Sequence, residues 1–358
     1  MNTMQFRLIR LARLILIAAC LLPVSVSAER PAFDIGGKVI DFGVRPLALP
    51  AVLYSEALRR DRVLHAALDK LGWRIQQHPF VSFREIAPHL GDGKLEAALL
   101  GDTPTVIALA QHDMRAVAVT KHAFASVVAS RHDTIGGLRG KRIGNVANTS
   151  AHYVLHEGLT TAGLTERNVT LVDTPMNEMA AALASTRIDA FASWEPIITL
   201  ALRQANPPVT IYRALGNDFL VLSQALISQE PEVARHFVAA LLRAHLWLRA
   251  HPAHLDRAIT WCLEAHERFA GKPSPLDKDT FRQIARRDAL SIPGMPFLPR
   301  NEPGLTTRLD KRLAFLKARG QLDALIDWPA LSHRLAPQLL EDVYRQAARY
   351  RLHDHDYE

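Results

Sequence analysis

The fold is decided by residues 138–153, which read Leu-Arg-Gly-Lys-Arg-Ile-Gly-Asn-Val-Ala-Asn-Thr-Ser-Ala-His-Tyr. A basic, glycine-containing turn leads into a short apolar strand, and a hydroxyl pair then opens a helix. The helix is expected over residues 150–162, because four apolar residues recur there at helical spacing. The first N–H groups of such a helix lack partners within it and favour negative charge. This stretch therefore predicts an α/β fold with an anion site beyond the strand.

Short apolar strands alternate with helical segments on both sides of this stretch. Strands are expected at 39–44, 73–80, 95–100, 115–119, 126–130, 142–146, 169–172 and 188–192, and an extended return segment at 219–228. Such alternation indicates right-handed βαβ units and a parallel sheet. The pattern restarts near residue 122, and the chain is mostly helical from Pro231 onward, with helices to about residue 266, at 306–319 and at 337–351.

These patterns predict two α/β lobes. The first lobe is expected over residues 38–121 and the second, inserted in the first, over 122–215. Residues 216–358 are expected to return to the first lobe and to complete it with a helical C-terminal extension.

Residues 1–28 have the composition of a secretory signal peptide. Three arginines precede an apolar run at 14–24, and Val-Ser-Ala at 26–28 supplies the small residues of a cleavage site. The run is too short to span a membrane. Export to the periplasm with Glu29 as the first mature residue is therefore expected. Lipid attachment at Cys20 is the alternative, although its cleavage box would leave an apolar core of only about six residues, against the ~7–15 typical of signal peptides.

The charge balance and the cysteine content exclude several classes of protein. The 358-residue chain has a formal charge of +7, and removal of residues 1–28 leaves 330 residues with a charge of +4. No cluster of Lys and Arg in that part has the form of a nucleic-acid footprint, so no nucleic-acid partner is expected. Only Cys262 would remain, so an internal disulfide is excluded and the stability must come from a hydrophobic core.

Five segments, in this order and spacing, carry a resemblance to a known family. They lie at residues 101–104 (Gly-Asp-Thr-Pro), 138–142, 150–153 (Ser-Ala-His-Tyr), 188–196 and 231–251. The chain resembles the type II solute-binding proteins of ABC importers for aliphatic sulfonates, taurine and nitrate, over nearly all of its mature length. The resemblance implies two Rossmann-like lobes joined by a hinge, with a ligand enclosed between them. It also implies a monomer that works with a membrane permease and its ATPase.

Two positions depart from the pattern of this family. Thr186 stands where the relatives often carry glycine, so the geometry of the turn before the strand at 188–192 is left open. Arg45-Pro46 at the end of the first strand is also unusual, and the arginine is either a ligand-specific anion contact or a solvated strand end.

Ligands of open α/β lobes bind at the carboxyl ends of strands, where helix N-termini converge. This rule selects the loops that follow the expected strands. The candidate ligand-binding residues are Arg45, Pro46, Leu47, Ser82, Phe83, Asp102, Thr103, Lys121, Thr149, Ser150, Ala151, His152, Asn177, Trp194 and Glu195.

Each of these candidates has a structural alternative. Thr149 and Ser150 supply hydroxyl donors for an oxyanion, but either residue also serves as an N-cap. Trp194 either covers an apolar ligand tail or packs in the core. A carboxylate at Asp102 would repel an anion, so a structural capping role is favoured there.

Metal and enzymatic functions are less well supported. His152 and His156 have the spacing of metal ligands, but no acidic or cysteine partner is placed to complete a set, so neither a metal nor another cofactor is expected. The His-Asp-His-Asp tail at 353–356 is expected to be a frayed terminus. Relatives of this fold include desulfinases with a catalytic cysteine, but Cys262 is expected to be a buried helical thiol. No catalytic residue is therefore expected.

These observations predict a periplasmic substrate-binding component of an ABC importer that captures a small organic anion by hinge closure. The Ser-Ala-His-Tyr segment favours an aliphatic sulfonate, while sulfate esters, taurine, nitrate and thiamine precursors are alternatives that share the same skeleton. A C–S or C–N hydrolase on the same scaffold is the alternative from another class, and a receptor or sensor module is a third.

Overall fold

A computed structural model describes residues 33–34, 37–130, 134–290, 298 and 303–358. The predicted signal peptide and Cys20 lie outside the described residues. The strands are β1 (Val39–Val44), β2 (Arg74–Pro79), β3 (Ala97–Gly101), β4 (Met114–Ala129), β5 (Arg142–Asn145), β6 (Thr170–Asp173), β7 (Ala190–Ser193) and β8 (Val209–Ser223).

Helices connect and cover these strands. They are α2 (Ala51–Arg60), α3 (Arg62–Lys70), α4 (Phe83–Gly91), α5 (Asp102–Gln111), α6 (Ser150–Thr161), α7 (Met179–Ala184), α8 (Ile197–Leu202), α9 (Gln224–Gln229), α10 (Pro231–Ala250), α11 (Pro252–Ala270), α12 (Lys278–Asp288), α13 (Pro303–Ala318), α14 (Trp328–Ser332) and α15 (Pro337–Arg345). None of the described helices combines the length and apolar character needed to cross a bilayer.

The strands form one mixed sheet in the order β2-β1-β3-β8-β4-β7-β5-β6. β1 pairs in parallel with β2 and β3, and β5 pairs in parallel with β6 and β7. β8 is antiparallel to β3 and β4, and β4 is antiparallel to β7. The α/β class is confirmed, but the prediction of a wholly parallel sheet is wrong at β4 and β8.

The long strands β4 and β8 differ most from the sequence prediction. The strands expected at 115–119 and 126–130 are one 16-residue strand, because no glycine or proline interrupts the residues between them. The extended segment expected at 219–228 is the end of β8 followed by α9. The remaining expected strands are present, with ends displaced by at most two residues.

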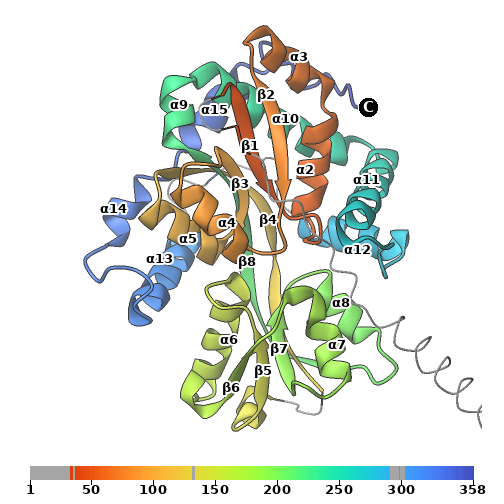
Figure 1. Cartoon of the computed structure of the whole chain (residues 1–358), viewed down its shortest axis with the longest axis vertical. Helices are drawn as coiled ribbons and strands as arrows, with labels where there is room; N and C mark the ends of the chain where they lie inside the picture. The colour runs from red at the N-terminus through yellow and green to blue at the C-terminus, as the bar shows by residue number, and fades with distance from the viewer. Residues whose placement is uncertain (1–32, 35–36, 131–133, 291–297, 299–302) are drawn as a thin grey trace, which may run out of the picture. The chain divides into compact units, whose positions relative to one another are not determined.

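β4 and β8 carry the sheet from one group of strands to the other, as Figure 1 shows. We call β1, β2 and β3 with their helices the first lobe, and β5, β6 and β7 with theirs the second lobe. Residues 33–358 form a single compact unit. The predicted boundaries at 121/122 and 215/216 fall inside β4 and β8, which both lobes share, and they remain a prediction.

Helix α10 packs against α2 and α3 of the first lobe. Arg243 of α10 is buried and donates from Nε to Asp61 Oδ2 at 2.8 Å. The same guanidinium donates from Nη1 to the carbonyl oxygens of Tyr350 and Arg351, at 2.9 and 3.2 Å. One buried cation therefore fixes the end of the chain against the start of α3.

Helix α13 reaches the second lobe. Its Phe315 packs edge-to-face against His152 and Tyr153 of α6, with ring centroids 5.3 and 5.5 Å apart. Arg312, one turn earlier on the same helix, pairs with Asp102 at the start of α5 in the first lobe. The C-terminal extension therefore contacts both lobes.

Thr186 adopts a left-handed backbone conformation, with φ of 55°. This conformation strains a β-branched residue and is one that glycine adopts readily. Arg142 Nη2 donates to the Thr186 carbonyl at 2.7 Å and holds the turn. The turn therefore keeps a geometry suited to glycine, although the chain has threonine there.

Candidate ligand-binding site

A cavity lies where the carboxyl ends of β1, β3, β5 and β7 meet the middle of β4 and β8. It contains about 440 Å³ of space, including space open to solvent. Its lining comes from both lobes and consists of Arg45, Phe83, Gly101, Pro104, Lys121, Ala123, Ala125, Thr149, Ser150, Trp194, Gly216, Asn217 and Asp218.

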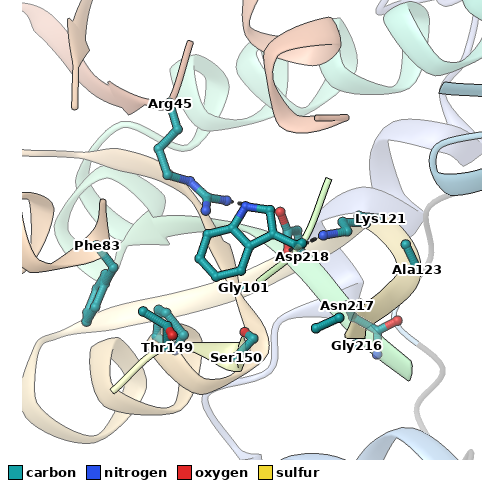
Figure 2. Close-up of a pocket in the computed structure, with 13 residues that line it drawn as sticks. Arg45, Phe83, Gly101, Lys121, Ala123, Thr149, Ser150, Gly216, Asn217 and Asp218 are labelled. Carbon is teal, nitrogen blue, oxygen red and sulfur yellow. Dashed lines mark hydrogen bonds and ion pairs between the residues drawn. The ribbon is translucent and has the colours of Figure 1, made fainter. Parts of the chain in front are cut away.

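Asp218 joins the two cations of this cavity. Arg45 Nη2 donates to Asp218 Oδ2 at 3.0 Å, and Lys121 Nζ lies 3.9 Å from Asp218 Oδ1. Figure 2 shows the two cations reaching the carboxylate from opposite sides. All three side chains are less than one-tenth exposed, so the ion pairs are shielded from water.

The strand that carries Lys121 is irregular beside it. The register of β4 against β8 shifts between Val119 and Lys121. Such bulges change the direction in which the next side chains point. The irregularity therefore accounts for a lysine that enters the cavity from the middle of a buried strand.

Three hydrogen-bonding atoms in the cavity lining are buried without a partner in the described structure. They are Arg45 Nε, Ser150 Oγ and Asn217 Nδ2. The amide oxygen of Asn217 lies 2.8 Å from His122 Nδ1. Buried polar groups are rarely left unsatisfied, so these three donors indicate a place for an acceptor.

Thr149 and Ser150 have different roles. Thr149 is the N-cap of α6, since its Oγ1 accepts from the His152 N–H at 3.2 Å and donates to the Val146 carbonyl at 2.8 Å. Ser150 is the first residue of the helix, and its hydroxyl makes no such bond. The cap therefore leaves the neighbouring hydroxyl available at the helix N-terminus.

Apolar side chains form the rest of the cavity wall. Phe83, Pro104, Ala123, Ala125 and Trp194 line it, and the Arg45 guanidinium carbon lies 5.9 Å from the centre of the Trp194 ring. An anionic group bound by the polar side chains would leave an attached carbon skeleton beside these residues. The lining therefore suits an amphipathic organic anion.

The two lobes approach closely at Gly101 and Ser150. Gly101 ends β3 in the first lobe, and Ser150 begins α6 in the second. A Cβ atom placed on Gly101 would lie 2.5 Å from Ser150 Oγ, a distance that forces a shift. The absence of a side chain at this position permits the close approach.

Six of the residues selected from the sequence line the cavity: Arg45, Phe83, Lys121, Thr149, Ser150 and Trp194. The other nine, which are Pro46, Leu47, Ser82, Asp102, Thr103, Ala151, His152, Asn177 and Glu195, lie outside its lining. Ser82 is the residue before α4, and Asn177 is exposed in a 3-10 turn.

Two of those nine residues are buried acids that bind other parts of the protein. Asp102 accepts from the Thr103 N–H at 2.8 Å and pairs with Arg312 at 2.9 Å. Glu195 accepts from the Thr199 N–H at 3.1 Å and pairs with Arg287 Nη2 at 2.8 Å. Both acids are therefore paired with arginines of the protein, and Arg287 also pairs with the buried Asp288 at 2.6 Å.

The histidines of α6 form a network outside the cavity lining. His152 Nδ1 accepts from the Asn148 N–H, and Nε2 lies 3.0 Å from Glu166 Oε1. Burial raises the pKa of Glu166, but hydrogen bonds and attraction to His152 and Arg319 outweigh burial and bring it to about 2. No group of three or more His, Cys, Asp or Glu suited to a metal ion occurs among the described residues.

Cys262 lies on α11, outside the cavity lining. It is fully buried, and burial raises the pKa of its thiol well above the usual value. A thiol in this environment is a poor nucleophile, because the reactive form is the thiolate.

The carboxyl-end rule missed seven lining residues: Gly101, Pro104, Ala123, Ala125, Gly216, Asn217 and Asp218. Gly101 and Pro104 belong to the Gly-Asp-Thr-Pro segment already singled out. The sequence offered one signal for three others, because Gly-Asn-Asp at 216–218 is a polar interruption between two apolar runs. A glycine within a strand pattern often marks close approach of a ligand or backbone.

Part of the sequence is similar to known proteins. The sequence pattern of the NMT1/THI5-like family matches residues 85–255. A protein of Brucella abortus (strain 2308) described as a binding protein is 25% identical over 175 residues, which are 46% of this chain and 54% of that protein. The matched region thus spans about half the length of the curated relatives.

Solved structures are similar over most of the chain. The alkanesulfonate-binding protein SsuA from Xanthomonas axonopodis pv. citri, bound to MOPS, has a TM-score of 0.63 at 19% identity and covers 82% of this chain and 97% of its own. The desulfurization enzyme DszB has a TM-score of 0.57 at 17% identity, covering 86% and 99%. The neighbours therefore include binding proteins and an enzyme. The chain has the type II periplasmic binding protein fold, and its residues 85–255 match the NMT1/THI5-like family pattern.

Proposed function

We propose that the protein is the substrate-binding component of an ABC importer and captures a small organic anion in the periplasm by closure of its two lobes. One observation carries the proposal: two buried cations and three unpartnered polar atoms meet in a cavity whose walls come from both lobes. Charge-assisted hydrogen bonds of this kind recognise oxyanions. The apolar wall and the similarity to an alkanesulfonate-binding protein favour an aliphatic sulfonate.

Titration calorimetry with charged and uncharged probes tests the proposed ligand class. Hexanesulfonate, ethyl sulfate, taurine and nitrate supply the anions, while hexanol and hexylammonium supply neutral and cationic controls. At least one anion is expected to bind and the two controls are not. Binding of hexanol or hexylammonium without binding of any anion would refute the proposed ligand class.

Small-angle scattering tests the proposed closure. A ligand that contacts both lobes shifts an open–closed equilibrium toward the closed form. The radius of gyration is therefore expected to fall when a saturating anionic probe is added. An unchanged radius at saturation would refute lobe closure without affecting the binding assignment.

The proposed export predicts that residues 1–28 are removed as a signal peptide. Mass spectrometry of the protein from a periplasmic extract is expected to give Glu29 as the first residue. A diacylated Cys20 would instead establish lipid anchoring.

A C–S hydrolase is a second candidate because of the similarity to DszB. Cys262 is buried away from the cavity lining, which argues against a cysteine nucleophile there. Hydrolysis of hexanesulfonate would release hexanol and sulfite. Incubation with this probe is expected to leave it intact, and sulfite release beyond one equivalent per protein would establish the enzyme.

A further inference from the structure

On the basis of the proposed anion-binding function, we infer that the cavity selects ligands with a single negative charge and that Asp218 sets this limit. The observation behind the inference is the charge balance of the lining. Among the described lining residues, Arg45 and Lys121 are cations and Asp218 is the acid. One positive charge is therefore in excess.

The acids next to the lining are held by arginines outside it. Asp102 and Arg312 form a buried pair at 2.9 Å, and Arg287 pairs with both Glu195, at 2.8 Å, and Asp288, at 2.6 Å. His122 contacts the lining through Asn217 Oδ1, which lies 2.8 Å from its Nδ1, and is not itself a lining residue. The excess charge of the described cavity therefore belongs to the three groups joined by Asp218.

Because these three side chains are buried, the excess positive charge determines which ligand charge the cavity favours. Arg45, Lys121 and Asp218 have side-chain exposures of 7, 8 and 9%. A charge that remains unbalanced at such a site is costly, because little water screens it. A monoanion balances the site, a neutral ligand leaves one positive charge, and a dianion leaves one negative charge.

The geometry adds direct repulsion against a second negative charge. Asp218 occupies the Nη2 side of Arg45 and leaves Nε for the ligand, together with Ser150 Oγ and Asn217 Nδ2. An anionic head group there would bind a guanidinium that already carries a carboxylate at the neighbouring nitrogen. The favoured class is an alkyl or aryl sulfonate or sulfate monoester, and the excluded class contains inorganic sulfate, phosphate monoesters and dicarboxylates.

Three probes with the same butyl chain test the inference by calorimetry at pH 8. Butanesulfonamide is neutral, butyl sulfate carries one negative charge, and butyl phosphate carries two because its second pKa is about 6. The unmodified protein is expected to bind butyl sulfate at least tenfold more tightly than either other probe. Equal affinity for butyl sulfate and butyl phosphate would overturn the charge limit while leaving anion binding intact.

Two variants are expected to move the preferred charge in opposite directions. Asp218→Asn increases the excess positive charge, so the preference for butyl sulfate over butyl phosphate should fall at least tenfold, which is about 1.4 kcal/mol. Lys121→Gln removes the excess, so the preference for butyl sulfate over butanesulfonamide should fall by a similar factor. If Asp218→Asn does not fold, Lys121→Gln still decides whether the charge balance sets the preference.

Asp113→Asn is the matched control, because it makes the same chemical change on a side chain that is 69% exposed. Its probe preferences should equal those of the unmodified protein. The inference would be overturned if Asp218→Asn or Lys121→Gln showed the same relative affinities for the three probes as this control. Failure of the unmodified protein to bind all three probes and every anion of the broader panel would instead refute the proposed function.

Discussion

Arg45 and Asp218, which stand 173 positions apart in the chain, are joined by a 3.0 Å hydrogen bond inside the cavity. Arg45 follows β1 and Asp218 lies in the middle of β8, so the bond links the end of one strand to the interior of another. Loss of Asp218 would leave two buried cations without a counter-charge, whereas loss of Arg45 would leave Asp218 with Lys121 alone.

Double-mutant analysis of this pair gives the first prediction. Arg45→Met and Asp218→Asn are each expected to lower the free energy of unfolding, by at most about 3–5 kcal/mol. The double variant should lose less than the sum, with a coupling energy of roughly 1–3 kcal/mol. Urea denaturation measures all three values, and strictly additive losses would contradict the coupling.

Ser150 and Thr149 are expected to separate ligand binding from helix capping. Ser150→Ala removes a donor to a charged ligand and should weaken hexanesulfonate binding by roughly 1.5–3 kcal/mol, with a stability change within about 0.5 kcal/mol. Thr149→Ala removes the N-cap bond seen at His152 and should lower stability by about 1 kcal/mol. Calorimetry and thermal melting distinguish the two, and a Ser150→Ala variant with unchanged affinity would contradict the assigned role.

A charge at position 150 provides a stricter test. Ser150→Asp keeps a side chain suited to the start of a helix. It also places a negative charge where the head group of the ligand is expected. The variant should therefore bind hexanesulfonate more weakly than Ser150→Ala does, and binding at the level of the unmodified protein would rule out a head group at this helix.

The left-handed turn before β7 is expected to be a site of stabilising substitution. Thr186→Gly relieves backbone strain of about 1–2 kcal/mol. This gain is larger than the free-energy cost of the conformational entropy that glycine adds to the unfolded chain. Stability should therefore rise by up to about 1 kcal/mol. Thr160→Gly, at an exposed position of α6, is the matched control and should lower stability by about 0.5 kcal/mol. A loss at both positions would show that the turn is not strained.

The pH dependence of stability should contain a contribution from Glu96. Burial raises the pKa of Glu96 to about 7, although its hydrogen bond from the Asp41 N–H opposes the shift. The folded protein therefore holds this proton more tightly than the unfolded chain does. Its contribution to stability is complete below about pH 4.5 and is lost as the pH rises through 7.

Glu96→Gln isolates that contribution, because the amide oxygen still accepts from the Asp41 N–H. The difference in unfolding free energy between the unmodified protein and the variant should fall steadily between pH 4.5 and 7. Chemical denaturation at a series of pH values measures it. A difference that is independent of pH would contradict a raised pKa.

Sequence patterns located most strands because each is a short apolar run between turn residues. They failed at β4, where the run continues without a breaker through Lys121 and His122. The antiparallel direction of β8 was also hidden, because strand pairing depends on contacts far apart in the sequence. Periodicity reports only which face of an element is buried.

The lining of the cavity was likewise predicted only in part. The loops after β1, β2, β5 and β7 were found from the carboxyl-end rule and supply Arg45, Phe83, Ser150 and Trp194 to the lining. Asp218 was missed because it comes from the middle of a strand shared by both lobes, for which the rule makes no prediction. The charge balance of the site, which depends on Asp218, therefore became apparent only in three dimensions.

The missing side chain at Gly101 has a consequence for how long a captured solute stays bound. A Cβ atom at this position would meet Ser150 Oγ at 2.5 Å, while its next neighbours lie at 3.5 Å or more, so alanine would turn the Ser150 hydroxyl away. The head group would still reach Arg45, but it would lose the hydrogen bond from that hydroxyl and the solute would escape sooner. Affinity differences among related complexes arise mostly from dissociation rates. Gly101 would thus govern residence time through the position of the Ser150 hydroxyl.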